Sequence, residues 1–146
     1  MKRQFLNTCT VFGLCALSAA TWAQDASADR IIETGLQVLK QIDSGQTGEV
    51  WENSAAFMKA RFPKAELTAM LGQSRQSVGS VATRTWASIN RVRYVQDTQT
   101  VPAGLYANVD YSTRLADGRT VFELVSFRQE ADGSWRLTGY VPRQTQ

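Results

Sequence analysis

Histidine is absent from this chain of 146 residues, and cysteine occurs only twice. Without an imidazole, the chain cannot hold a Ser-His-Asp triad, an imidazole metal site or a histidine proton shuttle. No apolar run approaches the roughly 20 residues that a membrane-spanning helix needs. What is present is an ordinary globular composition, with 43% hydrophobic and 20% charged residues, at a length that suits one domain.

The first 23 residues have the pattern of a secretory signal peptide. Two basic residues give a positive start, an apolar run covers residues 11–20, and the small residue Ala23 stands where a processing enzyme would cut. The alternative is a retained membrane anchor, but the apolar run is too short to cross a bilayer. We therefore predict a signal peptide over residues 1–23 and a periplasmic or secreted product.

Cleavage at that point changes both the charge and the redox chemistry of the chain. Residues 24–146 contain 14 basic and 13 acidic side chains, so the net charge of the mature domain is close to zero. We therefore expect no nucleic-acid partner, and no membrane association after cleavage. Cys9 and Cys15 both leave with the signal peptide, so packing rather than a disulfide must stabilise the domain.

Apolar residues recur at helical spacing in three stretches of the first half of the domain. The spacing predicts helices over residues 28–42, 50–62 and 64–78. Pro63 separates the second helix from the third, because proline in a helix interior removes a hydrogen bond and clashes with the preceding turn. Gly79 stands where a helix end would take a left-handed conformation.

From Arg84 onward the pattern changes to the alternation of strands. Four strands are predicted, over residues 85–96, 105–115, 120–129 and 134–141. Two of the three connections contain Asp-Gly, which favours tight turns. The order predicts one α+β domain over residues 24–146, with three N-terminal helices packed on a curved four-stranded antiparallel sheet of cystatin-like or cone-like form.

The closing strand carries the run Asp-Gly-x-Trp-Arg-x-x-Gly-Tyr over residues 132–140. Other residues precede it in a fixed order: Trp51, Ser54, Phe57, Lys59, Arg84, Pro102, Gly104, Tyr106, Tyr111, Thr113, Glu123 and Val125. This ordered set resembles a family of small exported bacterial proteins named domain of unknown function 4019. The helix-then-sheet order is also similar to the cone-shaped fold of nuclear-transport-factor-two-like domains. The resemblance implies export and a sheet that encloses a pocket, but no activity.

Glu123 is the first candidate functional residue. Strand alternation places it on the same face as Val121, Val125 and Phe127, where a carboxylate is costly unless it is hydrogen-bonded, paired or neutral. Its possible partners in the sheet are four arginines: Arg84, Arg91, Arg93 and Arg136. Two interpretations stay open at this point: a structural ion pair, or a general acid or ligand-orienting group in a pocket.

The candidate ligand pocket therefore comprises Glu123, Arg84, Tyr111 and Trp51, and filling of the core by the aromatics is the alternative. We assign no catalytic residue, and we expect neither a metal nor a cofactor. The leading hypothesis is a non-catalytic exported domain that binds a small apolar or amphipathic ligand or a periplasmic protein partner. Its alternative is a cofactor-free acid/base enzyme, an isomerase or hydrolase, that uses Glu123.

Overall fold

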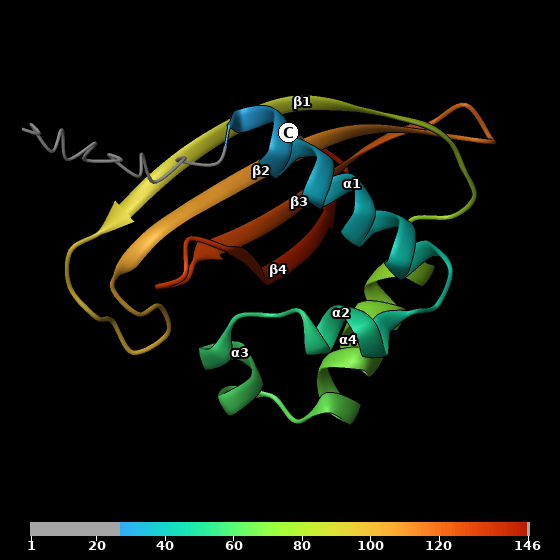
Figure 1. Cartoon of the computed structure of the whole chain (residues 1–146). Coiled ribbons are helices and arrows are strands. Elements are labelled where there is room, and N and C mark those ends of the chain that lie inside the picture. Colours follow the sequence, from blue (N-terminus) through green and yellow to red (C-terminus); the bar gives the residue numbers. More distant parts are fainter. Residues whose placement is uncertain (1–26, 146) are drawn as a thin grey trace, which may run out of the picture.

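The computed structural model describes residues 27–145, so the predicted signal peptide lies outside the described residues. Within this range, helices come first and strands follow (Figure 1). The helices are α1 (Ala28–Asp43), α2 (Thr47–Glu52), α3 (Ala56–Arg61) and α4 (Lys64–Gln76). The strands are β1 (Val81–Tyr94), β2 (Gly104–Leu115), β3 (Thr120–Gln129) and β4 (Trp135–Arg143). The α+β class and the four-stranded antiparallel sheet are confirmed.

The strands form an antiparallel meander in the order β1-β2-β3-β4, so β1 and β4 are the two edges of the sheet. Gly118 and Gly133 lie in the two predicted Asp-Gly turns, with φ of 88° and 81°. An L side chain rarely adopts such angles, which explains why glycine stands at both positions. The β1–β2 connection is longer and runs over residues 95–103.

Helix α1 covers one face of the sheet, which we call the inner face (Figure 1). Its buried side chains, among them Ile31 and Leu39, pack in one core cluster with Val109 and Val125 from the sheet. Ser27 caps the start of the helix, because its hydroxyl accepts a hydrogen bond from the Arg30 amide at 3.4 Å. Among residues 27–145, no helix combines the length and apolar character that a membrane span requires.

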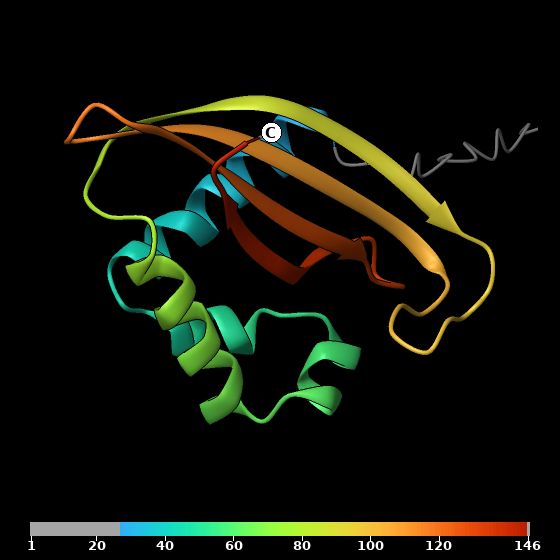
Figure 2. The ribbon, with the colours of Figure 1, turned by 180° about the vertical axis from the view of Figure 1, so that it is seen from behind.

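Helices α2, α3 and α4 lie beyond the β4 edge rather than over the centre of the sheet. Figure 2 shows the opposite side of the sheet, which we call the outer face, with α4 in front and α1 behind the strands. Residues on the outer face include Asn108, Asp110, Leu124, Ser126 and Val141, as the cross-strand pairs show. The outer face is therefore not covered by α1.

The prediction of three helices is wrong at the second helix, which is divided into α2 and α3. The chain leaves the helical path at Ser54 and Ala55 to contact β4. The Ala55 amide donates to the Leu137 carbonyl at 2.9 Å, and Ser54 forms a parallel bridge with the same residue. This hydrogen bond replaces one that a continuous helix would have made within itself.

The same contact lies beside an irregularity in β4. Leu137 is paired with Phe127 and Gly139 with Ser126, so Thr138 is an extra residue in β4. An extra residue of this kind bends a strand and disturbs its regular pairing. The bend lies where α2 and α3 approach the edge of the sheet.

Candidate functional site

Glu123 is completely buried on the inner face, and its carboxylate accepts four hydrogen bonds. Arg84 donates through Nε to Oε2 at 2.6 Å and through Nη2 to Oε1 at 3.1 Å. The Thr113 hydroxyl donates to Oε2, and the Tyr140 hydroxyl donates to Oε1 at 2.7 Å. A carboxylate held by a bidentate guanidinium and two hydroxyls has all its acceptor positions occupied.

The ion pairs continue from Arg84 toward the ends of two helices. Arg84 also donates to Asp43 at the end of α1, at 2.5 Å and 3.0 Å, and Arg75 near the end of α4 donates to the same carboxylate at 2.5 Å. We call Glu123, Arg84, Thr113, Tyr140 and Asp43 the Glu123 network. The network joins α1 to all four strands.

The pKa values of the network agree with a fixed pattern of charges. Burial alone would lower the pKa of Arg84, but its hydrogen bonds and charge interactions with Asp43 and Glu123 outweigh this and raise it. Burial would raise the pKa of Asp43, but Arg84 and Arg75 outweigh it and lower the pKa. Burial and the charge of Glu123 raise the pKa of Tyr140, so its hydroxyl remains a donor.

Tyr111 lies on the inner face beneath α1 and does not join the network. Its hydroxyl donates to the Ile32 carbonyl at 2.5 Å, and a Cβ built on Gly35 would lie 2.1 Å from that hydroxyl oxygen. The glycine therefore permits the close approach of α1 to the tyrosine ring. Burial raises the pKa of Tyr111 well above its usual value.

Trp51 lies at the junction of the short helices. Its indole Nε1 donates to the Phe62 carbonyl at 3.0 Å, and the ammonium groups of Lys59 and Lys64 lie 5.8 Å and 5.6 Å from a Trp51 ring. The structure thus brings Glu123 and Arg84 together. Tyr111 lies opposite Glu123 on the neighbouring strand but hydrogen-bonds to α1 instead, and Trp51 lies apart among the short helices. None of these four residues lines the cavities described next.

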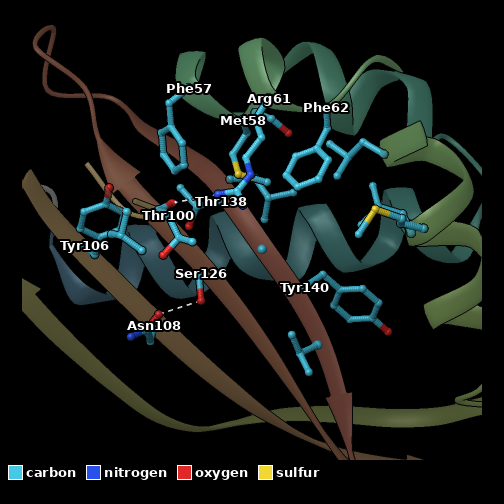
Figure 3. Close-up of a pocket in the computed structure, with 18 of the residues that line it drawn as sticks. Phe57, Met58, Arg61, Phe62, Thr100, Tyr106, Asn108, Ser126, Thr138 and Tyr140 are labelled. Atoms are coloured by element: carbon cyan, nitrogen blue, oxygen red, sulfur yellow. Dashed lines mark hydrogen bonds between the residues drawn. The ribbon is translucent and has the colours of Figure 1, made fainter. Parts of the chain in front are cut away.

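A cavity of about 510 Å³ lies on the outer side of β4, between that strand, helices α3 and α4, and the β1–β2 connection (Figure 3). We call it the β4 cavity. Its walls are mainly apolar or aromatic, including Phe57, Met58, Phe62, Met70, Tyr106 and Val141. Two further cavities, of about 210 Å³ and 100 Å³, are smaller. The size and lining of the β4 cavity are those of a small-molecule site.

Most polar side chains of the β4 cavity already have partners within the protein. The Ser126 hydroxyl donates to Asn108 at 2.7 Å, as Figure 3 shows, and the Tyr106 hydroxyl donates to the Pro102 carbonyl at 2.8 Å. Among the described residues that line the cavity, Arg61 is the only charged one. No cluster of acidic residues among residues 27–145 has an arrangement that would hold a metal ion.

Tyr140 is the one residue that belongs to both the Glu123 network and the lining of the β4 cavity. Its hydroxyl belongs to the Glu123 network, while the residue also lines the β4 cavity. Its strand partner is Val125 on the inner face, and its neighbour Gly139 pairs with Ser126 on the outer face. The edge position of β4 makes this possible, because side chains of both faces border the space beyond an edge strand.

The sequence prediction missed the β4 cavity because its lining comes from segments far apart in the chain. Phe57 and Met58 were placed in one long helix, whereas the break at residues 53–55 turns α3 toward β4. Met70 of α4 also lines the cavity and is 45% exposed, but this exposure is visible only in the structure.

No curated protein matches the chain significantly. The profile of a family described as "Protein of unknown function (DUF4019)" matches residues 34–140, which is more than half of the chain. The match begins within α1 and ends within β4, so it covers the helices and strands that form both the Glu123 network and the β4 cavity. The chain therefore belongs to this family, as the ordered residues of its sequence indicate.

Proposed function

We propose that this domain binds a small apolar or amphipathic molecule in the β4 cavity and does so after export. The observation that carries the proposal is the cavity itself: about 510 Å³ of space with mainly apolar walls. The cavity is partly open to solvent, so its apolar walls meet water. A ligand that covers these walls removes their apolar surface from water, which favours binding.

The alternative of an acid/base enzyme is less well supported. Glu123 lines none of the three cavities, and its oxygens are occupied by Arg84, Thr113 and Tyr140. A general acid or base must lie within hydrogen-bond reach of its substrate, directly or through one water. We therefore infer a positioning role for Glu123 in the fold and a binding role for the β4 cavity.

The export part of the proposal rests on the basic, apolar and small residues of positions 1–23. The cone-like form of the domain is part of the same proposal, and the cavity between β4 and the helices α3 and α4 supports it. A periplasmic protein partner docked at the cavity is the other occupant that the sequence allows. These occupants differ in mass by orders of magnitude and are easily distinguished.

The test is native mass spectrometry of the protein purified from its own host. We expect a chain that begins at Gln24 and carries a bound mass in the range of a small molecule. The variant Ser126→Leu puts a larger side chain into the cavity and should lose that mass, whereas Ser112→Leu, on the outer face but outside the cavity, should keep it. A wild-type protein without bound mass, or equal retention by both variants, would contradict the proposal.

A further inference from the structure

Within residues 27–145, Arg61 is the only charged side chain that lines the β4 cavity, and no acidic side chain lines it. Arg61 is the last residue of α3, and its Nη1 donates to the Thr100 carbonyl of the β1–β2 connection at 3.3 Å. The guanidinium also lies 5.5 Å from the centroid of the Phe62 ring. Figure 3 shows Arg61 extending from the helix among the other labelled lining residues.

The guanidinium of Arg61 has most of its donors available. An arginine carries five N–H donors, and here one long hydrogen bond to a backbone carbonyl is the hydrogen bond it makes within residues 27–145. Within the same residues no carboxylate forms an ion pair with Arg61, in contrast to Arg84 and Arg75, which both pair with Asp43. A cation with free donors at an apolar cavity fits an anionic group.

We propose that the occupant of the β4 cavity is an anionic amphiphile, a hydrocarbon chain with one carboxylate, whose carboxylate is bound by Arg61. This inference rests on the proposed binding function and adds the chemical class of the ligand. The chain lies against the apolar side chains of α3, α4 and β4, among them Met58, Phe62 and Met70. The carboxylate pairs with the Arg61 guanidinium at the exposed end of α3.

Charge complementarity decides the sign of the head group. A cationic head would be repelled by Arg61 and would find no carboxylate among the lining residues. A neutral head such as a hydroxyl can accept a hydrogen bond from the guanidinium but leaves its charge unpaired. A carboxylate accepts the planar pair of N–H groups in two parallel bonds, the geometry in which arginine binds most strongly.

Three probes with the same chain separate the contribution of the head group from that of the cavity. We expect isothermal titration calorimetry at low ionic strength to show dodecanoate binding about tenfold tighter than dodecanol, with dodecyltrimethylammonium weakest. Added salt should weaken dodecanoate binding and leave dodecanol unchanged, because Arg61 is exposed and its charge is screened. Equal affinities for the three probes would overturn the head-group assignment.

The matched variants are Arg61→Gln, Arg61→Lys and Lys59→Gln. Arg61→Gln should weaken dodecanoate binding about tenfold without changing dodecanol binding, and Arg61→Lys should restore part of the loss. Lys59→Gln removes a charge from the same helix but outside the cavity and should have no effect. A loss of dodecanoate affinity in Lys59→Gln equal to that in Arg61→Gln would contradict a specific role for Arg61.

The outcomes also separate this inference from the function on which it rests. If dodecanol and dodecanoate bind with equal affinity and Ser126→Leu binds neither of them, the cavity binds ligands but the head-group assignment is wrong. If no probe binds, and if the wild type and Ser126→Leu retain the same mass in native mass spectrometry, the binding function itself fails. Vesicles of phosphatidylglycerol test a membrane source of the anion; binding to vesicles without binding of free dodecanoate would overturn the assignment to a free amphiphile.

Discussion

The charged side chains on the two sides of β4 differ in how many hydrogen-bond partners the protein supplies to them. On the inner face, Glu123 is fully buried and each of its oxygens accepts hydrogen bonds from Arg84 and a hydroxyl. On the outer side, Arg61 stands at an apolar cavity with a single long hydrogen bond to the protein. A buried carboxylate whose partners all come from the fold has no acceptor position left for a ligand, whereas a cation with free donors at a cavity can bind one.

The comparison shows why a carboxylate on an apolar strand face is a poor guide to a functional site. Burial requires partners, and the fold supplies them before any ligand arrives. A charged side chain that borders a cavity and has few partners within the described residues is a better guide to a binding site. Substitutions in the Glu123 network should therefore lower the free energy of unfolding, and substitutions in the β4 cavity should weaken ligand binding.

The largest expected effect comes from Glu123→Gln. The change removes one partner of a buried ion pair and leaves Arg84 with less compensation inside the fold, so we expect a loss of about 3 kcal/mol in the free energy of unfolding, measured by urea denaturation. The control Glu52→Gln breaks the exposed pair with Lys64 and should leave stability unchanged. A change below about 1 kcal/mol in Glu123→Gln would remove the structural assignment.

A smaller effect is expected from Gly35→Ala beneath α1. Alanine normally stabilises a helix relative to glycine, but the new Cβ would lie 2.1 Å from the Tyr111 hydroxyl oxygen. We therefore expect a loss of about 2 kcal/mol, since the tightly packed inner layer has no room for a methyl group. Gly72→Ala in α4 is the matched control, because apart from its chain neighbours and the backbone of its own helix no atom lies within 4 Å of the added Cβ, and thermal melting should show a gain there. Equal gains in both variants would show that the inner layer is loose.

The smallest effect concerns acid sensitivity. The folded state lowers the pKa of Asp43 below 3.8, so this carboxylate contributes stability above that pH and loses the contribution as the pH falls through its folded pKa. The difference in free energy of unfolding between wild type and Asp43→Asn should be constant above about pH 5 and shrink below 3.8. Urea denaturation across this range measures it. A difference that grows toward low pH would mean that the sign is reversed.

Much of the fold follows from local signals in the sequence. The alternation of residues 120–129 predicts β3 with both bounds correct, and the Asp-Gly pairs predict the turns at Gly118 and Gly133. The same alternation places Glu123 on the apolar face with Arg84 among four possible partners. These features depend on strand period and turn chemistry, which neighbouring residues determine.

The break between α2 and α3 and the β4 cavity depend on contacts that no local pattern contains. The helical spacing continues through Ser54 and Ala55, but the Ala55 amide bonds to Leu137, more than eighty residues later in the chain. The position of Arg61 at the cavity has no local signal for the same reason, since it exists only after α3 has turned toward β4. Tertiary contacts can override helical propensity at such positions.

The most direct test of the account is a methyl NMR titration of the protein with dodecanoate. Met58 and Met70 both line the β4 cavity, whereas Ile31 and Ile42 belong to the core beneath α1. We predict that the two methionine methyl signals shift in proportion to ligand bound and that the two isoleucine signals stay in place. Shifts confined to the isoleucines, or no shift at either methionine, would contradict the claim that the ligand binds beside β4.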